Sequence, residues 1–330
     1  MKKILVITAK TDIHCHFVAL EIKKQGGDIL RINTEDFATN SRFSTTNRNN
    51  YENWVFSVYL KDSEIRFDRD SFDTVWYRKP DPVVAHESFQ EQAAKIFIER
   101  EYTSFLKAFY SLNSDKRWVN DYWKNRMASS KLLNLEIANH LGLQVPQTIV
   151  ANDKSQIQEF CEYFNWNVIV KSFFTEGFRT SDGKYWMNFA KRVTASAFQQ
   201  FADKIEYAPV LMQEYIEKDL ELRVTVIGEQ VFTAAIHSQE CEKSSQDFRA
   251  MTPLEIKHTV FDLPEEIAKK LLLFNRHYGL AFSTFDLILT SKGDYYFLEC
   301  NPNGQWYWIE ALTQMPMAKT MAEFLLGNAG

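Results

Sequence analysis

The chain opens with apolar and amphipathic blocks that follow one another closely. An apolar run at residues 3–9 (KILVITA) predicts a strand, helical spacing over 16–25 predicts a helix stopped by Gly26 and Gly27, and DILRIN predicts a second strand. A strand, a helix and a strand in this order imply a parallel sheet with a right-handed crossover. We therefore expect the N-terminal third to begin as a small α/β domain.

The remainder of this third alternates polar and strand-like stretches. The polar run 39–50 predicts a loop, residues 54–60 and 63–68 predict a hairpin, and DTVWYRKP at 73–80 predicts a strand stopped by Pro80. Apolar spacing over 88–113 is typical of a long amphipathic helix. A domain boundary is expected soon after it, near residues 115–118.

The later two thirds mix helices and strands without an internal repeat. Helices are predicted at 131–141, at 263–280 with a Gly279 cap, and at 317–326. Strands are predicted after Pro146, at 167–171, as a pair with a glycine-containing turn within 172–193, at 209–216, 221–228 and 230–239, and as a hairpin of 282–290 with 294–301. We expect three domains, at 1–117, 118–210 and 211–330.

Composition excludes several classes of protein. With 330 residues, 45% apolar and 25% charged residues and a net charge of −5, the chain is typical of a globular protein and offers no global field for nucleic acid or an anionic membrane. Its four cysteines lie far apart without a CxxC pair, which argues against a zinc site or a disulfide framework. We expect a protein of the cytoplasm with no membrane-spanning segment.

The predicted C-terminal hairpin carries candidate metal ligands. Side chains two apart in a strand share a face, so Glu299 and Asn301 project together and Asp286 on the neighbouring strand can face them. Two carboxylates and an amide oxygen suit Mg²⁺, which keeps several waters and is usually bound with nucleotide phosphates. Taken alone, these residues are more readily explained as strand-edge charges followed by a turn.

Other charged residues stand where an anion could be held. Lys171 ends a strand and Lys131 opens a helix, so both could reach an anion as point charges. The stretch 212–223 could form a hinge whose backbone pairs with an adenine edge, with Glu221 accepting from ribose and Arg223 contacting a phosphate. The alternatives are a solvated acidic loop and, for Arg223, a cross-strand ion pair.

Together these residues carry a family resemblance. Their order and spacing resemble the ATP-grasp superfamily, which implies an α/β (α+β) ATP-grasp fold with an N-terminal pre-ATP-grasp domain, a central domain and a C-terminal domain. The resemblance implies ATP and Mg²⁺, with two ions expected, as the cofactors. It assigns phosphates to Lys131 and Lys171, adenine to Gln213, Glu214, Tyr215 and Ile216, ribose to Glu221, catalysis to Arg223 and Lys171, and the metal to Asp286, Glu299 and Asn301.

A narrower resemblance covers nearly the whole chain. The pieces VWYRKP (75–80), AAIHSQ (234–239), DFR (247–249) and CNPNGQWYWIE (300–310) resemble the graspetide, or microviridin-type, peptide macrocyclases. This implies a ligase that phosphorylates Asp or Glu side chains of a ribosomally made precursor peptide with a leader. Those carboxyls would then be joined to Ser or Thr hydroxyls as esters, or to Lys amines as amides. A homodimer is also expected from this resemblance.

Further residues have both a functional and a structural interpretation. Arg78, Lys79, Asp247 and Arg249 are candidate contacts for the acidic peptide, with domain-interface salt bridges as the alternative for Arg78. His14 and His16 are expected to be surface groups, and Cys300 a small buried apolar residue. The aromatic residues 306–308 could line a substrate wall or a dimer contact, but such a run is more often core.

Two rival functions remain open. An ATP-grasp ligase that adds an amino acid to a protein tail or a small acid would use the same nucleotide site. A catalytically inert peptide-binding protein could keep the fold without the chemistry, although both lysines and all three candidate metal ligands are retained.

Overall fold

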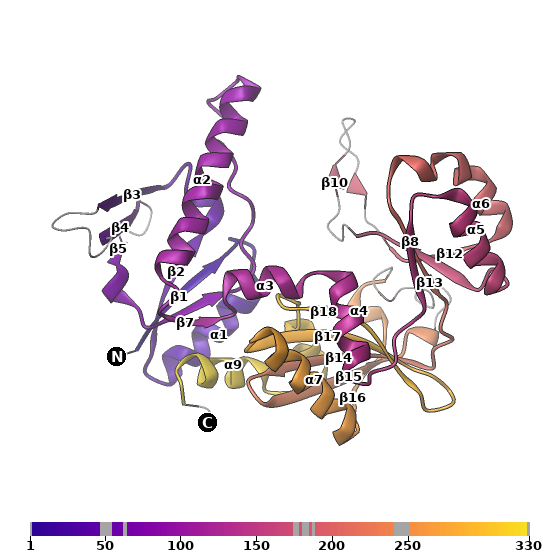
Figure 1. The fold of residues 1–330 in the computed structure, drawn as a ribbon. Helices are drawn as coiled ribbons and strands as arrows, with labels where there is room; N and C mark the ends of the chain where they lie inside the picture. Colours follow the sequence, from indigo (N-terminus) through magenta and orange to yellow (C-terminus); the bar gives the residue numbers. More distant parts are fainter. Residues whose placement is uncertain are drawn as a thin grey trace.

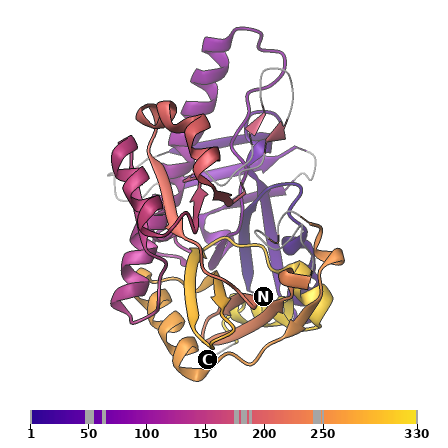
Figure 2. The same cartoon turned by 90° about the vertical axis from the view of Figure 1, so that its right-hand side faces the viewer.

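The computed structural model describes residues 2–46, 55–61, 65–173, 178–179, 185–186, 189–240, 248 and 251–328. Three groups of elements follow one another along the chain, and Figure 1 shows them from indigo through magenta to yellow. The two ends of the chain lie near each other in Figure 1 and Figure 2. Among the helices that the structure describes, none combines the length and apolarity needed to cross a membrane.

The N-terminal part is built on a parallel sheet in the order β2-β1-β6-β7. The apolar run at the start of the chain forms its buried β1, as predicted. A second, antiparallel sheet β3-β4-β5 contains the predicted hairpin. The elements are β1 (Lys3–Thr8), α1 (Ile13–Lys24), β2 (Asp28–Asn33), β3 (Ser41–Thr46), β4 (Val55–Leu60), β5 (Ile65–Asp68), β6 (Thr74–Tyr77), α2 (Gln92–Leu112) and β7 (Arg117–Val119).

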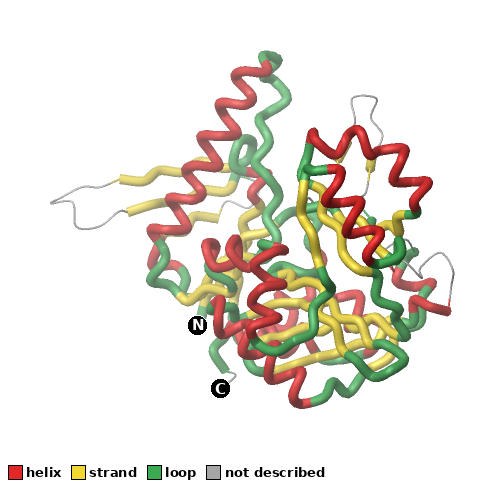
Figure 3. Tube along the Cα trace, turned by 45° about the vertical axis from the view of Figure 1, so that its right-hand side comes forward, coloured by secondary structure: helices red, strands yellow, loops and turns green. Residues whose placement is uncertain are grey.

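One prediction for this part was wrong. Residues 39–50 were expected to be a loop, but Ser41–Thr46 form β3, which pairs along its whole length with β4. Phe43 on this strand stacks on Phe105 of α2 at 4.0 Å between ring centroids, so an aromatic contact from a distant helix stabilises a locally polar strand. The long helix was predicted correctly, and Figure 3 shows it projecting beyond the sheets.

The central part is an antiparallel sheet, β12-β9-β13-β8, with its own core beneath α5 and α6. The short antiparallel pair β10-β11 confirms the strand pair predicted within 172–193, while Gly177 and Gly183 lie outside the described residues. The elements are α3 (Tyr122–Ala128), α4 (Lys131–His140), β8 (Thr148–Ala151), α5 (Lys154–Tyr163), β9 (Val168–Lys171), β10 (Phe178–Arg179), β11 (Tyr185–Trp186), β12 (Lys191–Val193), α6 (Ala195–Phe201) and β13 (Val210–Glu214).

The C-terminal part is a five-stranded antiparallel sheet, β16-β15-β14-β17-β18. Gly279 ends α7 in the left-handed conformation, with φ 66°, as predicted. The predicted hairpin and last helix are also present. The elements are β14 (Leu220–Ile227), β15 (Gln230–Ile236), β16 (His258–Val260), α7 (Glu265–Tyr278), β17 (Phe282–Leu289), β18 (Tyr295–Asn301), α8 (Tyr307–Thr313) and α9 (Met317–Leu325). Single 3₁₀ turns lie at Thr34–Asp36, Arg69–Ser71, Ala202–Tyr207, Ser238–Glu240 and Pro253–Glu255.

The last helix packs against the N-terminal part and so connects it to the C-terminal part. Apolar side chains of α9 share one core with α1 and β1, including Ile4, Val18 and Met321. Lys2 Nζ also donates to the Leu326 carbonyl at 2.5 Å. The two expected boundaries, after residues 117 and 210, lie within β7 and β13. The division into three domains stays a prediction.

Candidate active site

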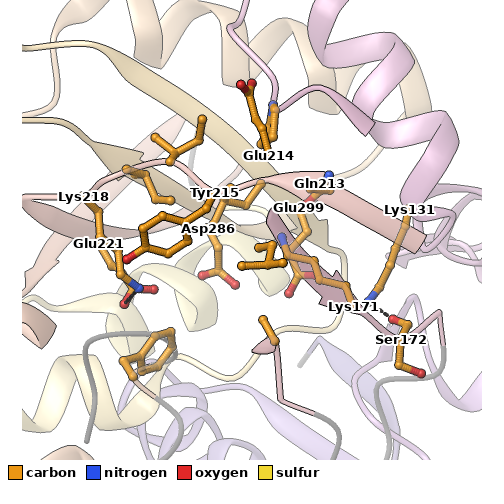
Figure 4. Close-up of a pocket in the computed structure, with 17 residues that line it drawn as sticks. Lys131, Lys171, Ser172, Gln213, Glu214, Tyr215, Lys218, Glu221, Asp286 and Glu299 are labelled. Atoms are coloured by element: carbon orange, nitrogen blue, oxygen red, sulfur yellow. Dashed lines mark hydrogen bonds and ion pairs between the residues drawn. The ribbon is translucent and has the colours of Figure 1, made fainter. Parts of the chain in front are cut away.

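A carboxylate pair lies on adjacent strands of the C-terminal sheet. The register of β17 and β18 sets Asp286 directly opposite Glu299, as predicted, and a bulge follows Asp286. Both side chains line a pocket between the C-terminal and central sheets. In Figure 4 they lie between two groups of charged side chains. The side-chain carboxylate of Glu299 forms no hydrogen bond or ion pair with the described residues, so its oxygens are available to a cation.

Arg223 belongs to the same row across the sheet. It lies opposite Asp286 on β14, and its Nη1 donates to Asp286 Oδ1 at 2.7 Å. Its Nη2 donates to the carbonyl of Gln305 at 2.8 Å. The cross-strand ion pair considered from the sequence is therefore present, and it places a buried guanidinium beside a candidate metal ligand.

Asn301 takes a different position from the two carboxylates. Its Oδ1 accepts the Asn303 backbone N–H at 2.9 Å, and it is not among the pocket-lining residues. Within the described residues, no group of three His, Cys, Asp or Glu side chains is placed to hold a metal ion. The two pocket carboxylates, with water and phosphate oxygens, still match the oxygen-rich, incompletely protein-ligated environment of Mg²⁺.

The two predicted lysines line the same pocket as the carboxylates. Lys171 ends β9 and Lys131 begins α4, and both line the pocket. The Lys131 ammonium donates to the Ser172 carbonyl at 2.6 Å, which fixes its direction (Figure 4). Two positively and two negatively charged side chains thus line one cavity, a combination that suits a metal-bound polyphosphate.

The predicted hinge crosses from the central to the C-terminal sheet. All four residues 213–216 line the pocket. Gln213 is buried and donates through Nε2 to Thr148 Oγ1 at 2.9 Å, while Tyr215 donates its backbone N–H to Asn167 O at 2.8 Å. The carboxylate of Glu214 accepts the Gln147 N–H at 2.8 Å. These bonds fix the hinge backbone as one wall of the cavity.

The sequence did not identify the partners of Glu221. Glu221 is only 8% exposed, so the solvated acidic loop is wrong for this residue. Its Oε1 accepts from Lys218 Nζ at 2.7 Å and from the Ser238 hydroxyl at 2.7 Å. Lys218 also lines the pocket and adds a third cation to it. The three-residue spacing between Lys218 and Glu221 was the available signal, but the intervening acidic residue obscured it.

The candidate peptide contacts are more dispersed. Arg78 is 1% exposed, and its Nη1 donates to the Asn303 carbonyl at 2.6 Å, a contact between the N- and C-terminal parts that favours the interface alternative. Burial lowers the Arg78 pKa to about 10. Lys79 is exposed beside a second hollow. Asp247 and Arg249 lie outside the described residues, although Phe248 between them lines the main pocket.

Two further expectations concern residues near the site. His14 was expected at the surface but is buried at 4% exposure, because its ring packs edge-on against Trp306 at 5.1 Å between ring centroids. His16 is exposed, as expected. Cys300 is buried, and burial raises its thiol pKa well above the usual value, which suits an unreactive core residue. Trp306 is completely buried, which confirms the core interpretation for that residue.

Comparison with known proteins agrees with this geometry. Residues 3–126 match the MvdD pre-ATP grasp domain, and residues 124–325 match the RimK-like ATP-grasp domain. The α-aminoadipate–LysW ligase LysX of Sulfurisphaera tokodaii is 22% identical over 218 residues, covering 63% of this chain and 69% of that protein.

Solved structures resemble the chain over its full length. A Chryseobacterium gregarium RiPP-associated ATP-grasp ligase, in complex with ADP and a leader and core peptide, has a TM-score of 0.91 and 25% identity, covering 100% of this chain and 98% of that one. Macrocyclase MdnC of Microcystis aeruginosa, bound with precursor peptide MdnA, has a TM-score of 0.86 and 25% identity, covering 98% of this chain and 99% of that one. With the RimK-like match over more than half its length, the chain belongs to the RimK-like ATP-grasp family and is an ATP-dependent ligase.

Proposed function

We propose that this ligase forms macrocycles in a ribosomally made precursor peptide by joining Asp or Glu side chains to Ser or Thr hydroxyls, or to Lys amines. The observation that carries the proposal is the pocket that Asp286, Glu299, Lys131 and Lys171 line together, on a chain similar throughout its length to a ligase solved with a leader and core peptide. The enzyme would act in the cytoplasm.

The residues around the pocket support a division of roles. Lys131 and Lys171 would hold the phosphates, the 213–216 hinge the adenine, and Glu221 the ribose. Asp286 and Glu299 would hold Mg²⁺, with two ions expected, and Asn301 would join them through the second lone pair of its Oδ1, which already accepts the Asn303 N–H. When bound, Mg²⁺ would neutralise the negative charge that develops on the phosphates. Arg223 would add its charge beside Asp286.

The chemistry follows from the poor leaving group of a carboxylate. A carboxylate oxygen of the peptide attacks the γ-phosphorus of ATP, the bond to the bridging oxygen breaks, and ADP leaves. A hydroxyl or amine of the same peptide then attacks the acyl carbon, loses its proton and expels phosphate. Both reacting groups are held on one chain beside the cavity, so positioning supplies much of the rate.

Peptide binding would use charges outside the nucleotide pocket. Exposed Lys79 beside the second hollow is a candidate contact for an acidic core peptide. Asp247 and Arg249 remain candidates that flank the pocket-lining Phe248. Arg78 is buried and bonded to the Asn303 carbonyl, so it would attract the acidic peptide through its positive charge and not through a direct contact. A homodimer also remains part of the proposal, and light scattering would test it.

A second candidate function is the addition of an amino acid to a protein or small acid, favoured by the similarity to LysX. Mass spectrometry separates the two candidates. Incubation with ATP, Mg²⁺ and the acidic precursor peptide should remove the mass of one water for each crosslink, whereas amino-acid addition would increase the mass. An unchanged precursor peptide with a leader would refute the macrocyclase proposal.

ADP release tests the metal assignment in the same reaction. Glu299→Gln preserves the size of the side chain but removes its charge, so peptide-dependent ADP release should be abolished. Glu206→Gln, on an exposed position of the central part, is the matched control and should retain turnover. Full turnover by the Glu299 variant would show that Glu299 does not hold the metal.

A further inference from the structure

A buried hydrogen-bonded cluster lies outside the nucleotide pocket, where the order of the N-terminal sheet reverses between β1 and β6. Asp12 caps α1, and its two carboxylate oxygens accept from different partners. Thr8 Oγ1 donates to Oδ2 at 2.7 Å, while the His14 ring nitrogen Nδ1 lies 3.1 Å from Oδ1. The ring of His14 is thereby fixed from the N-terminal part.

The other ring nitrogen of His14 reaches the C-terminal part. Its Nε2 accepts two backbone N–H groups, from Trp306 at 3.0 Å and from Tyr307 at 3.1 Å. A nitrogen that accepts hydrogen bonds carries no proton, so the imidazole is neutral and its single proton lies on Nδ1, directed at Asp12. Burial agrees with this state, because it lowers the His14 pKa to about 4.

The first of these N–H groups belongs to the peptide unit that joins Gln305 to Trp306. The carbonyl of the same unit accepts from Arg223 Nη2 at 2.8 Å. Because a peptide unit is rigid and planar, a bond that fixes its N–H also fixes the direction of its C=O. His14 and Arg223 are therefore linked through one rigid group, although they lie in different parts of the chain.

Arg223 depends on few contacts for its orientation. Its Nη1 is held by Asp286 and its Nη2 by the Gln305 carbonyl, while its buried Nε has no hydrogen-bond partner among the described residues. If Asp286 turns to a cation, the Gln305 carbonyl is the remaining fixed acceptor. Orientation of the guanidinium then rests on the peptide unit that His14 holds.

We propose that His14, oriented by Asp12, is a positioning residue that fixes the Gln305–Trp306 peptide unit and through it directs Arg223 toward the transferring phosphate. The last step rests on the proposed function. In this role His14 acts through the Gln305–Trp306 peptide unit and not through a contact in the second hollow, which it lines together with Asp12 and Gln305. Its effect on turnover requires Arg223, which distinguishes positioning from a general contribution to folding.

Two substitutions of similar polarity test the bond. In His14→Gln, the side-chain amide oxygen can occupy the place of Nε2 and accept the Trp306 N–H. In His14→Asn the shorter amide reaches only the place of Nδ1 and leaves that N–H without its acceptor. We expect kcat for peptide-dependent ADP release to fall about tenfold or more in His14→Asn, with KM for ATP changed less than about twofold. The kcat of His14→Gln should remain within about threefold of the wild-type value. The control His16→Asn, at an exposed position, should have the wild-type kcat.

Coupling to Arg223 is tested by a double-mutant cycle. Because Arg223→Lys removes the planar fork that His14 helps to direct, adding His14→Asn to it should lower kcat by less than about threefold. Equal kcat for His14→Asn and His14→Gln, or a tenfold loss that persists in the Arg223→Lys background, would overturn the proposal. Thermal midpoints of all variants, recorded in parallel, identify losses that come from unfolding.

Hydrogen exchange makes the test independent of turnover. In nucleotide-free protein, the amides of Trp306 and Tyr307 should exchange at least about tenfold faster in His14→Asn than in His14→Gln. If the wild type fails to modify the peptide, the macrocyclase proposal fails, whereas this exchange difference still supports the His14 bond. In that case, peptide-independent hydrolysis of ATP tests the link to Arg223, because it should be slower in His14→Asn than in His14→Gln but equal for the two variants in the Arg223→Lys background. Equal exchange or equal hydrolysis for His14→Asn and His14→Gln would overturn the proposal.

Discussion

The stability and the nucleotide affinity of this site should be most sensitive to the loss of single buried charges. Lys218 and Glu221 form an ion pair at 2.7 Å with side chains 4% and 11% exposed. Lys218→Met would remove this ammonium from beside Glu221 in a poorly solvated position, which should lower the stability by about 3 kcal/mol and raise KM for ATP. Denaturant unfolding and initial rates measure the two effects. Lys204→Met, at an exposed position, is the control. An unchanged KM for ATP in Lys218→Met would show that Lys218 and Glu221 do not contribute to nucleotide binding.

The buried imidazole of His14 also predicts a pH dependence of stability. Burial lowers its folded-state pKa from the ordinary 6.5 to about 4; the hydrogen bond to Asp12 raises this pKa, and the positive charges of Arg78 and Lys79 lower it further. Between these values the unfolded chain binds more protons, so stability falls as the pH falls. From pH 7 to pH 5 the wild type should lose about 2 kcal/mol more than His14→Gln.

Denaturation midpoints of both proteins at the two pH values measure this difference. The lowered pKa of Asp12 acts below its ordinary value of 3.8, outside this window, and so does not contribute. Equal losses in the two proteins would show that His14 is not held neutral.

At the scale of elements, the hairpin of β17 and β18 depends on a close approach after its second strand. A Cβ on Gly304 would overlap the Thr284 hydroxyl and lie 2.7 and 2.8 Å from Cβ and Cγ2 of that residue. Gly304→Ala should therefore displace the 303–307 loop that holds Arg78 and Arg223, lowering the thermal midpoint and kcat together. Lys292→Ala, in the exposed turn at the other end of the hairpin, is the control. Wild-type behaviour of Gly304→Ala would show that the loop tolerates displacement.

Elements with their own periodic pattern were predictable, and contacts between distant segments were not. The strands carrying Arg223, Asp286 and Glu299 were recognised from local alternation, and their cross-strand register followed. By contrast, β3 is polar by itself and became a strand through Phe43 and α2. The burial of His14 depends on Trp306, 292 positions away, and no local sequence pattern predicts a contact over that separation.

At the scale of the whole molecule, the nucleotide pocket joins parts with separate cores. Ile157, Val168 and Phe198 belong to the central core, whereas Phe274, Phe285 and Phe297 belong to a different one beneath the C-terminal sheet. Residues of both sheets line the pocket, including Lys171 from β9 and Asp286 from β17. A ligand that binds only the folded pocket must therefore stabilise both parts at once.

This arrangement predicts two thermal transitions that a nucleotide brings together. In calorimetry without ligand, the central part should unfold in a separate transition at a lower temperature than the larger remainder of the chain. The reason is that its hydrophobic core is small and separate from the other cores. Mg²⁺ with a non-hydrolysable ATP analogue at a hundredfold its dissociation constant should stabilise the pocket by about 2.7 kcal/mol and move the lower transition toward the upper one. Chelation of Mg²⁺, or Glu299→Gln, should reverse most of that shift, because the phosphates would then lack the cation that the carboxylates hold. A single transition that the nucleotide leaves unmoved would show that the pocket does not couple the two sheets.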